Sequence, residues 1–106
     1  MLQTKNVSFT TSSSDEDLLY NEAVKEKVME LFKVTDAFEY DKLVANGIIL
    51  SLDIFCKDTK VSVNGESYND LIENTIYTTS DTRIRSLRIK DSGVVGTISF
   101  RKGGAN

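Results

Sequence analysis

The stretch from Arg83 to Gly103 constrains the fold most strongly, because it alternates apolar and polar residues on both sides of a turn signal. A period of two is typical of β-strands, and the Asp-Ser-Gly triplet at 91–93 is typical of a hairpin turn. The apolar residues around that turn are Ile84, Leu87, Ile89, Val94, Val95, Ile98 and Phe100. We therefore predict a C-terminal β-hairpin over residues 84–101, in which Gly96 marks a bulge or a close approach of two backbones.

Residues 14–33 carry the pattern of an amphipathic helix. Ser14 is followed three residues later by Asp17, which is the form of a capping box. Apolar side chains then recur at helical spacing, at Tyr20, Val24, Val28 and Leu31. We predict a helix over residues 15–33.

A second capping-box form opens at Ser67, three residues before Asp70. The apolar stripe that follows it consists of Tyr68, Leu71, Ile72 and Ile76. This stripe predicts a shorter amphipathic helix over residues 68–78. The helix would follow a turn at Asn64-Gly65, a pair that tolerates positive φ.

The remaining segments are less sharply defined by their sequence. Residues 48–55 form an apolar run that fits either a buried strand or a short buried helix, and we expect irregular structure in residues 34–47. We expect a flexible arm over residues 1–14, beginning with a short β-favouring piece, and a mobile tail over residues 102–106. With 106 residues, 40% of them hydrophobic, the chain suffices for one core. The prediction is a single α+β domain, with two amphipathic helices packed on a small mixed or antiparallel sheet that ends in the hairpin.

Composition argues against several classes of function. The net charge is −3 and the basic residues are scattered, so we expect no nucleic-acid partner. No apolar run approaches the length of a membrane-spanning helix or of a signal peptide, which favours folding in a cytoplasm and no membrane partner. The chain has no histidine and one cysteine, Cys56, so it lacks the common metal-ligand sets and any histidine-activated nucleophile. We expect no metal, no cofactor, no small-molecule substrate and no enzymatic activity.

A binding mode that needs no particular side-chain chemistry remains possible at the predicted hairpin. Its last strand would offer an edge to an extended partner, and the residues expected to take part in this strand addition are Val94, Val95, Thr97, Ile98, Ser99 and Phe100. In the alternative arrangement, which the sequence slightly favours, residues 5–10 cover that edge.

Several motifs follow one another in a characteristic order between Glu22 and Arg101. The first helix closes on Val34-Thr35, the next segment closes on Asn46-Gly47, and the apolar run supplies Leu50 and Phe55. Then come the predicted second helix, the triplet Asp81-Thr82-Arg83 followed by Ile84, and the closing hairpin. This order resembles the small baseplate wedge or sheath-initiator family of contractile phage tails, which includes the equivalent subunit of type VI secretion baseplates. The chain departs from the family in lacking a basic stretch after Thr35 and in holding Thr82 where the family has proline.

The resemblance implies a structural role in the virion, in a tail baseplate assembled in the host cytoplasm. Residues Asp81, Thr82, Arg83 and Ile84 would dock on the baseplate wedge proteins, and the hairpin would accept extended arms of the tail sheath protein. The Arg83 guanidinium would bind helix-terminal carbonyls or a carboxylate of a partner, or else pair within the chain with Asp81. An alternative function is that of a small acidic, phage-type inhibitor that binds and occludes a host enzyme.

Overall fold

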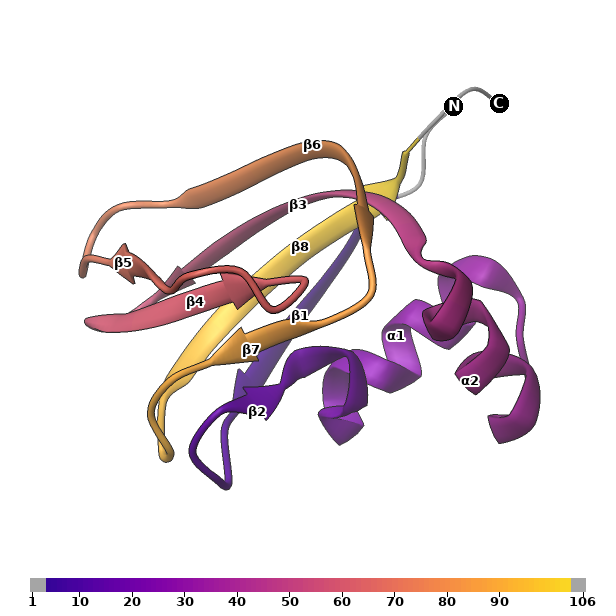
Figure 1. Ribbon diagram of the computed structural model, residues 1–106, viewed down its shortest axis with the longest axis horizontal. Coiled ribbons are helices and arrows are strands. Elements are labelled where there is room, and N and C mark those ends of the chain that lie inside the picture. The colour runs from indigo at the N-terminus through magenta and orange to yellow at the C-terminus, as the bar shows by residue number, and fades with distance from the viewer. Residues whose placement is uncertain (1–3, 104–106) are drawn as a thin grey trace.

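The computed structural model describes residues 4–103, which form two four-stranded antiparallel sheets and two α-helices (Figure 1). The predicted α+β class is therefore confirmed. The strands are β1 (Thr4–Thr10), β2 (Glu16–Asp17), β3 (Ile48–Cys56), β4 (Thr59–Val63), β5 (Asn69–Leu71), β6 (Tyr77–Ile84), β7 (Leu87–Ile89) and β8 (Val95–Lys102). The helices are the short 3-10 helix η1 (Leu18–Tyr20) and the α-helices α1 (Glu22–Phe32) and α2 (Ala37–Asn46).

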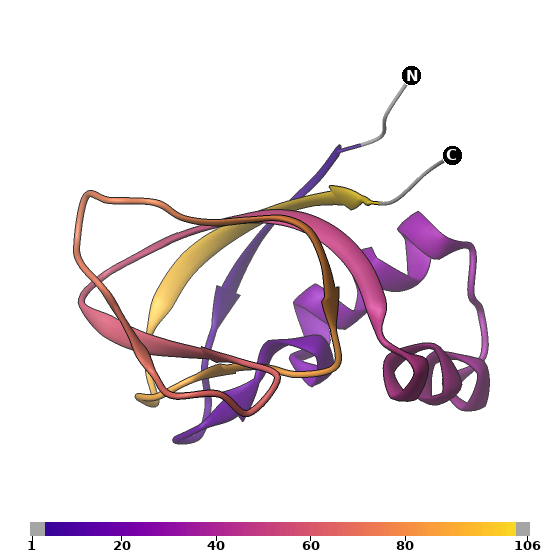
Figure 2. The same cartoon turned by 45° about the horizontal axis from the view of Figure 1, so that its top comes forward.

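The second sheet repeats the strand order of the first. The strand order is β1-β8-β3-β6 in the first sheet and β2-β7-β4-β5 in the second. At each position the two strands, such as β1 and β2 or β8 and β7, are consecutive in the sequence. The two sheets therefore lie one over the other, with strands that are consecutive in sequence at matching positions. Figure 2 shows these two layers, with both α-helices at one end. Between the layers lies the core, whose fully buried side chains include Leu50, Leu52, Ile54, Ile84, Leu87, Ile89, Ile98 and Phe100.

The first helix begins later than predicted. Residues Glu16 and Asp17 pair with β7 instead of opening a helix, and Asp17 caps the 3-10 helix η1. The α-helix begins after Asn21, whose side-chain oxygen accepts hydrogen bonds from the N–H groups of Ala23 and Val24. The prediction from Ser14 is wrong because strand pairing uses the first turn of the expected helix. The apolar face of α1, formed by Val24, Val28 and Leu31, is buried as expected.

Two other segments that were ambiguous in sequence have definite structures. The expectation of irregular structure in residues 34–47 is wrong, since α2 occupies Ala37–Asn46 and buries Tyr40 and Val44. Its N-cap is Asp36, which accepts hydrogen bonds from two backbone N–H groups in the first turn. The apolar run after it is strand β3, whose inward-facing side chains alternate with outward-facing ones.

The second predicted helix, over residues 68–78, does not form. Residues Asn69–Leu71 make strand β5 on β4, and the Tyr77–Ile84 strand β6 pairs with β3. The Lys60 ammonium, on β4, contacts the Asp70 carboxylate opposite at 2.6 Å. Pairing with these strands outweighs the helical pattern, because a helix this short needs a buried apolar face to be stable. The turn predicted at Asn64-Gly65 is confirmed, with φ values of 57° and 75°.

The two ends of the described chain are strands. The expectation of a flexible arm is wrong for Thr4–Thr10, because β1 pairs along its whole length with β8. At the other end, Lys102 still belongs to β8, and residues 1–3 and 104–106 lie outside the described part. The predicted C-terminal hairpin corresponds to β7 and β8 on either side of the turn at 91–93, with β7 in the second sheet and β8 in the first.

The half-buried Asp17 gives the fold a testable pH dependence. Its carboxylate accepts hydrogen bonds from the N–H groups of Leu19 and Leu87, at 3.0 and 3.1 Å, yet burial raises its pKa above the usual 3.8. Between the usual pKa of 3.8 and the raised pKa of the folded state, Asp17 is still protonated in the folded protein but is ionised in the unfolded chain. The contribution of Asp17 to stability therefore falls as the pH rises through this range.

We expect Asp17→Asn, which keeps an acceptor, to be at least as stable as the parent at about pH 7, with the difference shrinking towards pH 4. Asp17→Ala leaves the Leu19 and Leu87 N–H groups without this acceptor and should lose about 2 kcal/mol near pH 4, and less at about pH 7, where the contribution of Asp17 is smaller. Urea unfolding of the three proteins at each pH measures these differences. Equal stability of the Asn and Ala variants would contradict the role given to the acceptor.

Candidate functional site

The outer edge of β6 is a border of the first sheet. Within residues 4–103, β6 has a single hydrogen-bonded neighbour strand, β3, and so forms one border of the first sheet. The opposite border, β1, packs against α1. In Figure 1 the first part of the β6 ribbon runs along the upper border of the molecule, away from the helices, and its last part bends down towards β7. We call the outer side of residues 77–80 the β6 edge.

The direction of the backbone groups along this edge follows from the neighbouring strand. The Gly103 N–H donates to the Ile49 carbonyl at 2.8 Å, so at Ile49 the backbone of β3 faces away from β6. Because backbone groups alternate in direction along a strand, Leu52 and Ile54 direct theirs towards β6, where they meet Thr79 and Tyr77. Thr78, between these two, therefore directs its N–H and C=O outward.

An irregularity in β6 ends the regular edge. The register between β3 and β6 shifts between Leu50 and Leu52, and β6 carries one residue more than β3 across this interval. At this irregularity Asp81 adopts a left-handed conformation, with a φ of 45°. Its N–H donates to the Ser51 hydroxyl at 3.0 Å. A bulge of this kind bends a strand and limits the length over which another strand can pair with it.

The predicted docking residues Asp81, Thr82, Arg83 and Ile84 all lie on β6, but they have different environments. Ile84 is buried in the core. The Arg83 guanidinium donates to the carbonyls of Asn46 and Gly47, at 2.9 and 3.4 Å, where α2 ends. A cation at a helix C-terminus stabilises the unpaired carbonyls there. The Arg83 guanidinium thus binds helix-terminal carbonyls of its own chain, whereas the sequence suggested carbonyls or a carboxylate of a partner, or a pair with Asp81.

The residues predicted for strand addition do not form a free edge. Val95, Thr97, Ile98, Ser99 and Phe100 belong to β8, which pairs with β1 on one side and with β3 on the other. Val94, just before β8, donates its N–H to the Thr11 hydroxyl. The prediction of strand addition at β8 is therefore wrong, because both edges of this strand are already paired. The alternative, in which residues 5–10 cover the edge, is confirmed. Sequence reasoning missed the β6 edge, because the segment that contains it looked helical.

Exposed apolar side chains lie in the connection that leads into β6 and on the neighbouring part of the first sheet. Ile72 and Ile76 are 59% and 61% exposed in the connection from β5 to β6, and Phe55 and Val95 are 43% and 61% exposed on the first sheet. Phe55, Val95 and the intervening Glu73 line one hollow of about 290 Å³, which brings the connection and the sheet face together. Exposed apolar groups beside an unpaired strand are typical of a binding surface.

One buried polar atom at this edge has no partner. The hydroxyl of Thr79 is inaccessible to solvent and makes no hydrogen bond to any residue in the 4–103 range. Thr79 lies on the β6 edge, opposite Leu52 of the core. A buried hydroxyl without a hydrogen bond costs free energy.

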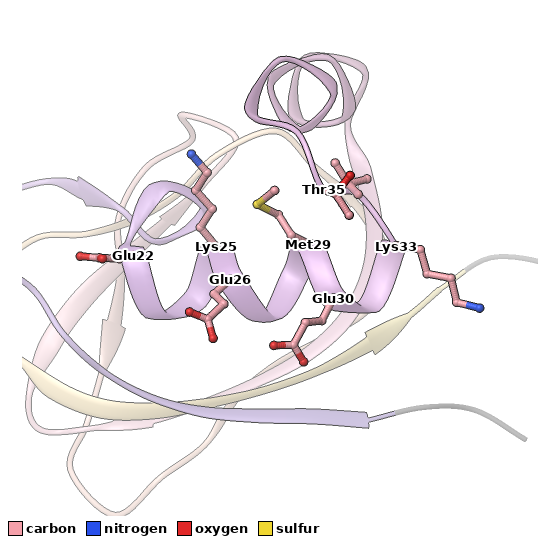
Figure 3. A pocket seen from close by; sticks show the side chains of 8 residues that line it. Glu22, Lys25, Glu26, Met29, Glu30, Lys33 and Thr35 are labelled. Atoms are coloured by element: carbon pink, nitrogen blue, oxygen red, sulfur yellow. The ribbon is translucent and has the colours of Figure 1, made fainter.

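A second hollow, of about 490 Å³, lies along α1 (Figure 3). In the figure Lys25 and Met29 point to one side of the helix, whereas Glu26 and Glu30 point to the other. The Lys25 ammonium lies 5.4 Å from the centre of the Tyr40 ring of α2, so this side of α1 faces α2. The charges around the hollow are of both signs and are held on flexible stems, which indicates no particular ligand.

The described residues offer little for catalysis or metal binding. Within residues 4–103 no group of three or more Cys, Asp or Glu side chains is arranged to hold a metal ion. Burial raises the pKa of the Cys56 thiol, and the nearby Asp58 carboxylate adds to the shift, so this thiol is a weak nucleophile. No helix in this part of the chain is long and apolar enough to cross a membrane. Comparison with protein-family models, with curated protein sequences and with solved structures finds no match.

Proposed function

We propose that this protein is a structural subunit that binds an extended segment of a partner protein along the β6 edge. The observation that carries the proposal is the outward-facing backbone of Thr78 on a border strand of the first sheet. In strand addition the main-chain hydrogen bonds supply affinity, and side chains on either face set the register. The function is therefore one of assembly and not of catalysis.

Two further features of the β6 edge support this mode of binding. Border strands are commonly protected by lysine, proline or charge, yet residues 77–80 read Tyr-Thr-Thr-Ser. The bulge at Asp81 would confine the added strand to the first half of β6.

The resemblance in sequence to the sheath-initiator family suggests which assembly the protein belongs to and which partners it binds. In that setting the subunit belongs to the baseplate of a contractile tail, and its partners are the tail sheath protein and the baseplate wedge proteins. The incoming arm of the sheath protein would occupy the β6 edge in place of the β8 edge first expected. Templating of the first sheath ring would then depend on main-chain pairing at Thr78.

Replacement of one outward-facing amide tests the proposal. Thr78→Pro removes the N–H that a partner strand would use, and proline is tolerated on a border strand when that N–H faces outward. The matched control is Thr78→Val, which also loses the hydroxyl bond to Asp53 but keeps the amide. We expect both variants to fold, and only Thr78→Pro to lose incorporation into tail particles purified from cells that make this chain.

The particles also separate the two candidate functions. A baseplate subunit sediments with purified tails and is detected there by an antibody against the chain, whereas an inhibitor of a host enzyme stays in the soluble lysate. Incorporation of Thr78→Pro at the level of Thr78→Val would show that β6 is not the site of assembly. Absence of the parent chain from the particles would exclude the baseplate setting.

A further inference from the structure

We infer that the segment that binds the β6 edge is a basic strand, which carries lysine or arginine together with apolar residues. This inference rests on the proposed function and adds the chemistry of the partner to it. It follows from the charges and apolar side chains that surround the edge.

Four carboxylates surround the β6 edge, and none of them forms an ion pair with a residue in the 4–103 range. They are Asp53, Asp58, Glu66 and Glu73. Two hydrogen bonds and one hollow place three of them: the Thr78 hydroxyl donates to Asp53 at 2.8 Å, the Glu73 N–H donates to Asp58 at 2.6 Å, and Glu73 lines the hollow beside Phe55. Burial raises the pKa of Tyr77, the first residue of β6, and the negative charge of the Glu66 carboxylate adds to the shift.

The neighbouring cations do not neutralise these carboxylates. Lys60 is paired with Asp70, and Arg83 is bound to the end of α2, beyond the bulge. Lys57 lines the same hollow as Glu73 and forms no ion pair within residues 4–103. Four acids against one lysine leave a negative potential at the β6 edge, and a complementary strand must be positive.

The apolar part of the partner is inferred from the exposed side chains that precede β6. Ile76, the residue before β6, is 61% exposed, and Ile72, in the same connection, is 59% exposed. Asp53 lies opposite Thr78, and its side chain is on the face that carries Phe55 two residues later. A partner strand that carries both basic and apolar side chains would therefore meet a carboxylate and apolar groups close together.

Synthetic peptides test this inference directly. One peptide repeats Lys-Val, a second repeats Glu-Val, and a third repeats Ser-Val; each is measured by fluorescence anisotropy against the full chain at low and moderate salt. We expect the Lys-Val peptide to bind at least about tenfold more tightly than the Ser-Val peptide at low salt, and the Glu-Val peptide to bind least. Added salt should reduce this preference, since surface charges are screened over about 10 Å at 0.1 M.

Charge reversals show whether the preference arises at the β6 edge. The double variant Glu66→Lys with Glu73→Lys should lose the preference for the Lys-Val peptide. In the control, Glu26→Lys, a carboxylate on the exposed side of α1 is reversed, and the preference should persist. Thr78→Pro should abolish binding of every peptide, because it removes the shared main-chain contact.

The possible failures are distinct. If Thr78→Pro abolishes binding but the three peptides bind equally, strand addition stands and the basic partner is wrong. If the Lys-Val peptide binds Thr78→Pro as well as the parent, its attachment is non-specific charge attraction and the inference is wrong. If no peptide binds in a manner sensitive to Thr78→Pro, strand addition at β6 is itself contradicted.

Discussion

Replacing Gly96 by alanine is expected to destabilise the protein by about 3 kcal/mol, because β8 has no room for a side chain at this position. A Cβ on Gly96 would lie 2.5 Å from the Cys56 Cβ, 2.8 Å from the Phe55 carbonyl oxygen and 3.1 Å from the Phe9 ring. Two of these neighbours are parts of β3 that cannot turn aside as a flexible side-chain end can. For a domain of this size the melting temperature should fall by roughly 15 °C.

The position of Gly96 explains why this small change has a large effect. Gly96, near the start of β8, lies opposite Phe9 on β1 and opposite Cys56 on β3, so it has a paired strand on both sides. The Phe9 side chain is 2% exposed and packs over the glycine. Any displacement of β8 here is passed to both of its neighbours, because close-packed interiors transmit strain.

A matched variant and a chemical probe check this expectation. Thr97→Ala changes the next residue, whose side chain is exposed, and should cost under about 1 kcal/mol. The Cys56 thiol is 5% exposed in the parent protein and should react with a thiol reagent much faster in Gly96→Ala. An unchanged melting temperature together with an unreactive Cys56 would contradict the close packing described for β8.

Periodicity predicted the elements whose apolar face is buried. The face of α1 at Val24, Val28 and Leu31 and the inward side of β8 at Ile98 and Phe100 are in the core as expected. Both elements are long enough for their periods, 3.6 and 2.0 residues, to be distinguished. Their burial is a property that the local sequence already encodes.

The second helix failed for the opposite reason. Its apolar stripe was real in the sequence, but of that stripe only Leu71 is buried in the structure, whereas Ile72 and Ile76 are exposed. A pattern of apolar residues indicates a helix only if the protein uses that face for its core. Here the exposed isoleucines belong to the candidate binding surface, which no local rule distinguishes from a core face.

The candidate site depended on contacts distant in sequence. The hydrogen-bond partners of Arg83 could not be predicted from its neighbours in sequence, because the carbonyls that it binds at the end of α2 are 36 and 37 residues away. The pairing of β1 with β8 joins residues from the two ends of the chain, and it closes the edge that the hairpin alone would have exposed. A sequence indicates that a strand exists, whereas which of its edges is free depends on the whole topology.

Asn64 connects this topology to the β6 edge. It occupies a left-handed conformation, with a φ of 57°, in the turn between β4 and β5. Its side chain donates to the Arg83 carbonyl at 2.9 Å and accepts from the N–H groups of Arg85 and Ser86 at 2.6 and 3.3 Å. These bonds hold the bend at which the chain leaves β6 in the first sheet and enters β7 in the second.

Asn64→Ala is expected to destabilise the protein by about 3 kcal/mol, because it loses these hydrogen bonds and also strains the left-handed backbone. Asn64→Gly relieves the strain but not the lost bonds, so it should cost about 2 kcal/mol. Asn64→Asp keeps both acceptor contacts and loses one donor, so it should cost about 1 kcal/mol. Urea unfolding gives this order, and amide exchange at Arg85 and Ser86 should accelerate in the Ala and Gly variants but not in the Asp variant. Equal exchange in all three would show that the bend is held by the strands alone and not by Asn64.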